Sequence, residues 1–65
     1  MSKLKEYRES KGVKQVAIAA HLGVTRQTYA QYEESPENMS IKQAQAACDF
    51  LGCEMGDIFL PVIVD

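Results

Sequence analysis

The chain has 65 residues, a formal net charge of −2 and 46% hydrophobic residues. This length fits one small domain, which buries only about 60% of its unfolded surface, so a stand-alone enzyme with an enclosed site for a small-molecule substrate or cofactor is not expected. No apolar run approaches the roughly 20 residues of a membrane span, and the N-terminus lacks the apolar core of a signal peptide, so we expect a cytoplasmic protein without a membrane partner.

The charge is divided unevenly along the chain. Residues 1–31 carry a net charge of +4, whereas residues 32–65 carry −6. A chain polarised in this way can present a basic face to an anionic partner although it is acidic overall. The same distribution also fits solvated helix faces that have no partner.

The first predicted helix runs from residue 2 or 3 to residue 11. Leu4, Tyr7 and Arg8 fall on one face at the i, i+3 and i+4 spacing of an amphipathic helix. Gly12 follows as the residue that ends the helix, because glycine adopts the left-handed backbone of a helix C-terminus without strain.

Two further short helices are predicted over residues 15–22 and 26–33, with a tight turn between them. Gly23 lies in the turn, Thr25 is the N-cap of the third helix, and Ala19 is small enough to let that helix come close. The apolar residues that interlock across the turn are Ile18, Leu22, Val24, Tyr29 and Tyr32. This arrangement is typical of a helix-turn-helix, whose second helix can lie in the major groove of DNA.

A loop over residues 34–39 and two more helices complete the pattern. Ser40 and Gln43 form a capping box that opens a helix ending at Gly52, and a last helix is expected over about residues 55–60, before Pro61. The residues expected to be buried on these helices are Ile41, Ala44, Ala47, Cys48, Leu51, Ile58 and Phe59. The predicted fold is therefore a compact, all-α, five-helix domain over residues 1–65, with the helix-turn-helix at helices 2–3 and a short apolar tail at residues 61–65.

Cys48 and Cys53 are a poor basis for a zinc site. Two ligands are missing, and the single histidine, His21, lies on a different helix, where we expect a solvated surface residue. We interpret the cysteines as small buried hydrophobes, with a metal site or a regulatory disulfide as the alternative. No nucleophile–base pair, metal set or phosphate loop can be assembled, so no enzyme is predicted.

With these elements placed, the chain resembles the lambda-repressor-like helix-turn-helix domains of phage repressors and Cro proteins, also called the Cro/C1 or XRE type. The resemblance covers residues 4–60 and is carried by LKEYRESKG, by QxxxAxxLGVTRQTY and by LGCEMGDIF. It implies sequence-specific binding of double-stranded DNA by a small transcriptional regulator. A palindromic operator with two half-sites is expected, and with it a weak homodimer that uses residues 58–65.

The resemblance also implies roles for individual residues. Gln15 matches a phosphate contact at the start of the second helix, where free N–H groups suit an anion, and Lys14 places a cation beside it. Arg26 and Gln27 can bond guanine and adenine edges, and capping alone would account for Thr25. The predicted DNA-contacting residues are Lys14, Gln15, Thr25, Arg26, Gln27, Ala30 and Gln31.

Arg8 and Glu33 match an ion pair that ties the first helix to the end of the third in related domains. Just beyond it, Glu34 and Glu37 would repel phosphates, which predicts a shallow salt dependence of DNA binding. The outer side of the second helix is unusually apolar at Val16, Ala17 and Ala20. Alanine is a good helix former, and we favour this interpretation of the apolar residues. As a contact surface, together with the acidic half of the chain, they support an alternative function, in which the same fold serves as a protein-interaction module of the antitoxin or antirepressor kind.

Overall fold

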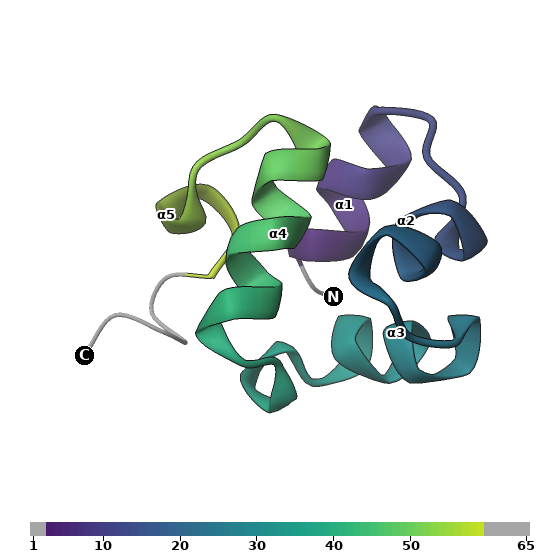
Figure 1. The fold of residues 1–65 in the computed structure, drawn as a ribbon. Coiled ribbons are helices and arrows are strands. Elements are labelled where there is room, and N and C mark those ends of the chain that lie inside the picture. Colours follow the sequence, from purple (N-terminus) through teal and green to yellow (C-terminus); the bar gives the residue numbers. More distant parts are fainter. Residues whose placement is uncertain (1–2, 60–65) are drawn as a thin grey trace.

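The structure is a computed structural model that describes residues 3–59, and every regular element in this range is a helix (Figure 1). In chain order the elements are α1 (Lys3–Ser10), α2 (Gln15–Leu22), α3 (Arg26–Glu34), the 3-10 helix η1 (Pro36–Asn38), α4 (Ile41–Leu51) and α5 (Met55–Ile58). The predicted all-α class is confirmed. No helix within residues 3–59 is long and apolar enough to cross a membrane.

The helix bounds differ from the prediction only near their ends. α1 ends at Ser10 and α3 extends to Glu34, while the predicted loop contains the short helix η1. α5 ends at Ile58, and Phe59 caps it. The predicted last residue of this helix and the tail at residues 61–65 lie outside the described residues.

The turn between α2 and α3 has the chemistry that the sequence predicts. Gly23 has the left-handed backbone, with φ of 75°, and Val24 donates its N–H to the Ala19 carbonyl at 3.0 Å. These bonds use carbonyls that the end of a helix otherwise leaves unpaired. Thr25 then caps α3, because its Oγ1 accepts the N–H of Thr28 at 3.1 Å. The two helices are thus joined by a short turn with satisfied backbone groups.

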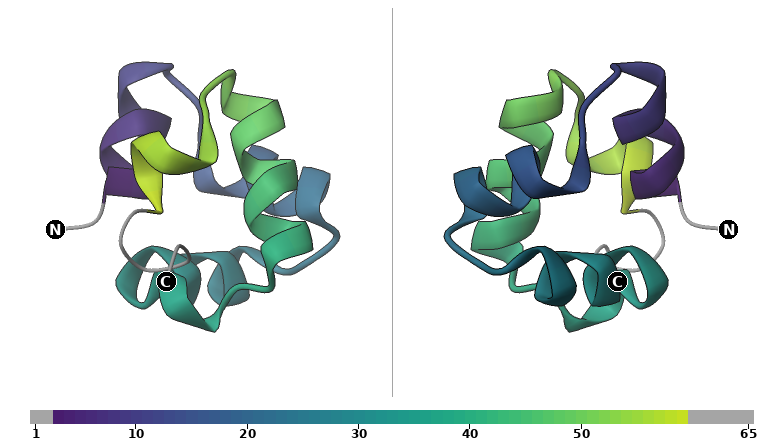
Figure 2. Two further views of the ribbon diagram at one scale, coloured as in Figure 1. Left: turned by 90° about the vertical axis from the view of Figure 1, so that its left-hand side faces the viewer. Right: turned by 90° about the vertical axis from the view of Figure 1, so that its right-hand side faces the viewer.

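The core lies among all five α-helices and the end of the loop. α2 packs against α3 and α4, whereas α5 packs against α1 and α4. Figure 1 shows α5 at one side of the molecule and the α2–α3 pair at the other, and Figure 2 shows α3 along the lower side in both further views. The buried apolar residues are Leu4, Ile18, Ala19, Tyr29, Met39, Ala44, Ala47, Cys48, Leu51, Ile58 and Phe59. Among residues 3–59, this packing leaves the outer face of α3 exposed.

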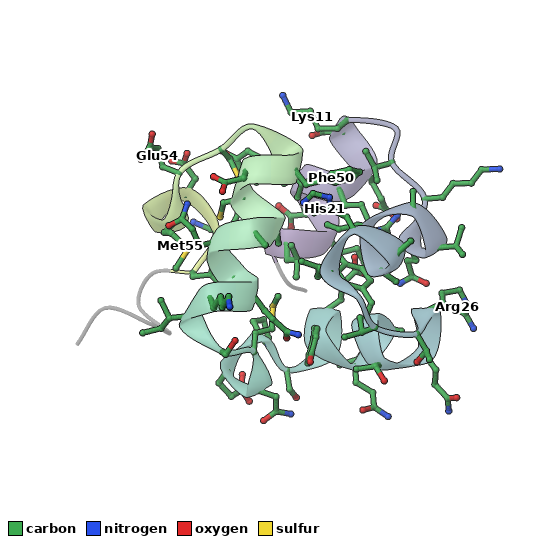
Figure 3. All side chains as sticks on the ribbon, viewed as in Figure 1. Lys11, His21, Arg26, Phe50, Glu54 and Met55 are labelled. Carbon is green, nitrogen blue, oxygen red and sulfur yellow. The ribbon has the colours of Figure 1, made fainter. Side chains whose placement is uncertain are left out.

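The burial of one side chain and a ring contact of another were not predicted correctly. Ile41, predicted to be buried, is 66% exposed, because it lies in the first turn of α4 and the buried stripe of that helix begins one turn later, at Ala44. His21 is exposed as expected, but its ring stacks on Phe50 of α4, with the ring centroids 4.6 Å apart (Figure 3).

Candidate nucleic-acid interface

The start of α3 is an exposed polar surface. Arg26, Gln27 and Gln31 are exposed, and Ala30 is half-buried between them. Gln27 and Gln31 are four residues apart, so they lie on the same face of the helix one turn from each other. Lys14 is also exposed, directly before α2. The predicted contact residues therefore share the helix-turn-helix surface, with Thr25 occupied as the cap of α3.

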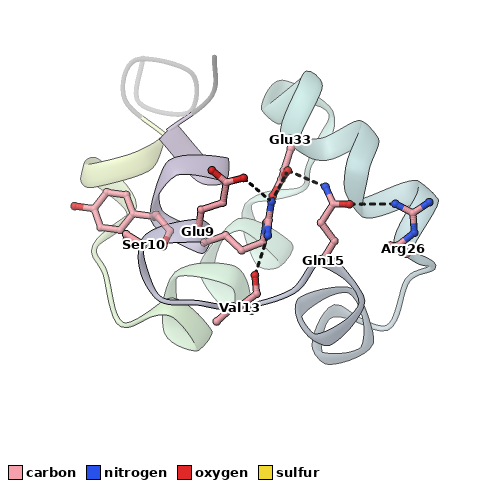
Figure 4. A network of polar contacts seen from close by, with 8 residues as sticks. Glu9, Ser10, Val13, Gln15, Arg26 and Glu33 are labelled. Carbon is pink, nitrogen blue, oxygen red and sulfur yellow. Dashed lines mark hydrogen bonds and ion pairs between the residues drawn. The ribbon is translucent and has the colours of Figure 1, made fainter.

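Gln15 connects the two helices through both ends of its side-chain amide. Its Oε1 accepts a hydrogen bond from Nη1 of Arg26 at 3.1 Å, and its Nε2 donates to Oε1 of Glu33 at 2.9 Å (Figure 4). Since Arg26 begins α3 and Glu33 lies near its end, Gln15 fixes the start of α2 against the whole length of α3. The predicted phosphate contact thus also has a structural role.

Arg8 completes this polar network from α1. Its Nε donates to Oε2 of Glu33 at 2.5 Å, and its Nη1 donates to the Val13 carbonyl at 2.8 Å. Both charged side chains are nearly buried, with Arg8 8% and Glu33 6% exposed. A buried pair of this kind contributes stability only while both partners are present, because either charge alone would be buried without compensation.

The surroundings of Glu33 favour its ionised form. Burial would raise the pKa of the carboxyl, but the hydrogen bonds from Arg8 and Gln15 outweigh burial and hold the pKa below its ordinary value of 4.5. The Tyr29 hydroxyl is buried close enough to Arg8 and Glu33 to interact with both, but its geometry makes no hydrogen bond to a partner within the described residues. Burial first, and then the neighbouring Glu33, raise the pKa of this hydroxyl. At neutral pH the network therefore holds an ionised Glu33 and a neutral Tyr29.

The acidic residues after this network lie at the far end of α3. Glu34 is the last residue of the helix and Glu37 belongs to η1, and both are exposed. The helical rise places Glu34 about 12 Å along the axis from Arg26. This separation exceeds the Debye length of about 8 Å at physiological salt, so repulsion by Glu34 acts weakly on a phosphate at the start of α3.

The described residues do not form a metal site. Within residues 3–59, no group of three or more His, Cys, Asp or Glu could hold a metal ion. The polar residues that the fold brings together are instead those of the α2–α3 unit and its link to α1.

Comparison with known proteins agrees with this geometry. A family model described as "Helix-turn-helix" matches residues 4–58. The chain belongs to this Cro/C1-like, XRE-type family. It is also 37% identical over 59 residues to an uncharacterized HTH-type transcriptional regulator of Methanocaldococcus jannaschii, a match that covers 91% of this chain and 89% of the relative. Membership in the XRE-type family places the protein among DNA-binding regulators of transcription, a class that is typically not enzymatic.

The sequence pattern did not indicate the double hydrogen bonding of Gln15. Its partners are 11 and 18 residues away, on a different helix. Helical periodicity reports only which residues share a face of one helix. The one available signal was the presence of Glu33 near the end of α3 and of Gln15 at the start of α2, two polar residues that can bond to each other.

Proposed function

We propose that this protein is a small, sequence-specific regulator of the phage or prophage repressor or Cro-like kind, with α3 in the major groove of double-stranded DNA. The observation that carries the proposal is the exposed start of α3, where Arg26 donates a hydrogen bond to Gln15 and Gln27 is exposed. A helix-turn-helix presents this end of its second helix to base edges. Such a regulator acts where the DNA lies, in the cytoplasm of a bacterial or phage-infected cell.

Each exposed residue has a chemical task in this proposal. Gln27 and Gln31 bond the N6 and N7 edge of adenines, whereas Arg26 forks onto a guanine or a phosphate. Ala30 contacts a thymine methyl group between them. Lys14 neutralises a phosphate next to the start of α2, where the N-cap makes no side-chain hydrogen bond to the helix.

The operator is proposed to be palindromic and read by a weak homodimer. Residues 58–65 were expected to form the dimer contact, but the side chains of Ile58 and Phe59 are buried in the core of their own chain. The contact therefore falls to residues 60–65, which lie outside the described residues. Sedimentation equilibrium of the chain without residues 61–65 tests this: the proposal expects less dimer, and an unchanged monomer–dimer balance refutes it.

Selection of bound sequences from a random pool of duplex DNA tests the function directly. The proposal expects enrichment of one half-site, repeated about one helical turn away in inverted orientation. The Gln27→Ala variant, folded as judged by its Tm, should lose preference at one base pair of that half-site. No enrichment by the wild-type chain would refute sequence-specific binding.

Exposed apolar residues on α2 and α4 favour a second candidate function, a protein-interaction module of the antitoxin or antirepressor kind. Val16 is 58% and Phe50 39% exposed, and Phe50 stacks with His21 across α2 and α4. Regulatory activity in cells separates the two candidates. Loss of activity in Gln27→Ala and Gln31→Ala supports DNA reading, whereas loss in Val16→Ser and Ala20→Ser with intact glutamine variants supports a protein partner.

A further inference from the structure

The junction between α4 and α5 brings two cysteines together. Gly52 ends α4 with a left-handed backbone, φ of 73°, and the N–H groups of Gly52 and Cys53 both bond the Cys48 carbonyl, at 2.7 and 3.0 Å. This ending combines the 6→1 bond of a Schellman motif with the 5→1 bond of an αL motif, and in such endings the residue after the glycine frequently packs against the residue whose carbonyl accepts its N–H. Those two positions are occupied by Cys53 and Cys48. Both are free thiols, and each perturbs the pKa of the other.

The two thiols differ in access. Cys48 is fully buried in the core, whereas Cys53 is half-buried at its edge. Burial, and then the interaction with Cys53, raise the pKa of Cys48 from 9.0 to about 12. The pKa of Cys53 is also raised, because the effect of burial exceeds the opposite effect of its interaction with Cys48. Cys53 is therefore the thiol that a reagent in solution meets first, and Cys48 is the thiol behind it.

We propose that Cys53 and Cys48 form a reversible dithiol–disulfide site, oxidised by low-molecular-weight disulfides such as oxidised glutathione. A disulfide fits this position better than a bound soft metal ion, because it is uncharged and burial disfavours two thiolates. The proposal is independent of DNA binding, since the cysteines lie on the α4–α5 side of the molecule, away from the start of α3 (Figure 1).

The exchange proceeds in two balanced steps. The Cys53 thiolate, its proton released to solvent, attacks one sulfur of oxidised glutathione, the S–S bond breaks, and one glutathione thiolate leaves. The Cys48 thiolate, formed by loss of its proton, then attacks Cys53 Sγ of the mixed disulfide and expels the second glutathione thiolate. Two protein thiols are oxidised, one glutathione disulfide is reduced to two thiols, and the released protons return to the leaving thiolates.

The bond would join the last turn of α4 to the residue before the N-cap of α5. α5 is only four residues long and depends on its contacts with α1 and α4. A disulfide lowers the conformational entropy of the unfolded chain and fixes the residue before the N-cap of α5 to α4. Oxidation should therefore raise the Tm by about 5–10 °C.

The test is incubation of the reduced full chain with oxidised glutathione at mildly alkaline pH, followed by intact-mass measurement, thiol titration and thermal unfolding. The proposal expects a monomer lighter by two hydrogen atoms, no free thiol, a raised Tm, and reversal by dithiothreitol. In Cys48→Ala the reaction should stop with one glutathione on Cys53, and in Cys53→Ser the thiol of Cys48 should stay free.

Three results would overturn the proposal. One is a wild-type chain that stops at the mixed disulfide as Cys48→Ala does, and another is addition of two glutathione molecules. The third is a disulfide between two chains in place of one within the chain. Cys53→Ser keeps the fully buried thiol in place, so it remains an informative folded control if Cys48→Ala is too unstable to measure.

Discussion

Replacement of Arg8 by Met tests the buried network that joins α1 to the α2–α3 unit. The change deletes two hydrogen bonds to Glu33 and one to the Val13 carbonyl, and it leaves a carboxylate that is 6% exposed without its cation. Breaking a buried pair costs about 3–5 kcal/mol, and the remaining Gln15 hydrogen bond places this case near 3 kcal/mol. For a domain of this size such a loss lowers the Tm by about 12 °C or more.

The assay is thermal and urea unfolding followed by circular dichroism at neutral pH. The matched control is Lys11→Met, which also removes a cation near the end of α1 but from an exposed position, so its free energy of unfolding should change by less than about 0.5 kcal/mol. The double variant Arg8→Met/Glu33→Gln should recover part of the loss, because it removes the uncompensated charge. Equal Tm values for Arg8→Met and Lys11→Met would refute the reasoning.

Three further predictions concern pH, the turn and salt. The pKa of Glu33 is lowered in the folded state, so its contribution to stability is complete above the ordinary pKa of 4.5 and is lost as the pH falls through the folded pKa. Urea unfolding at several pH values should show this loss in the wild type, whereas the free energy of unfolding of Glu33→Gln should change less with pH. Parallel pH profiles for the two proteins would contradict this prediction. Gly23→Ala should lower the free energy of unfolding by about 1 kcal/mol in the same assay. The loss comes from backbone strain alone, because φ of Gly23 is 75° and nothing lies within 4 Å of the added Cβ. An unchanged midpoint of urea unfolding would contradict this prediction. Lys14→Ala should reduce the slope of log K against log salt by about one, whereas Lys42→Ala, on α4, should leave this slope unchanged. Equal slopes for the wild type and Lys14→Ala would remove Lys14 from the interface.

Local chemistry explains why most of the fold could be predicted from the sequence. Gly23 and Gly52 stand where the backbone turns left-handed, and Thr25 and Ser40 accept the N–H bonds of the helices that follow them. Each of these features depends on residues only a few positions apart, so the local sequence is enough to predict where a helix begins or ends. Ile41 lies on the same face of α4 as the buried residues of that helix. Its exposure depends on where the neighbouring helices end, and the periodicity of one helix cannot predict this.

The exposure of the candidate contact residues could be predicted from the sequence, whereas their hydrogen bonds could not. Arg26, Gln27 and Gln31 could be placed on an outward face because their spacing and their position after the turn define it. The bonds from Gln15 to Arg26 and Glu33, and the stacking of His21 on Phe50, join helices through the tertiary packing. The orientation of one helix against another sets these contacts, and no local pattern encodes it.

The affinity of Gln27→Ala for the selected operator is the measurement that tests the central claim most directly. Measured at one fixed salt concentration against the operator and against duplexes changed at single base pairs, this variant should bind the operator more weakly than the wild type, by on the order of 10- to 100-fold for each half-site, because each subunit of the proposed dimer loses one base contact. It should also lose discrimination at one base pair, with an unchanged Tm. Wild-type affinity and wild-type discrimination in a folded Gln27→Ala variant would contradict the claim that this face of α3 reads DNA.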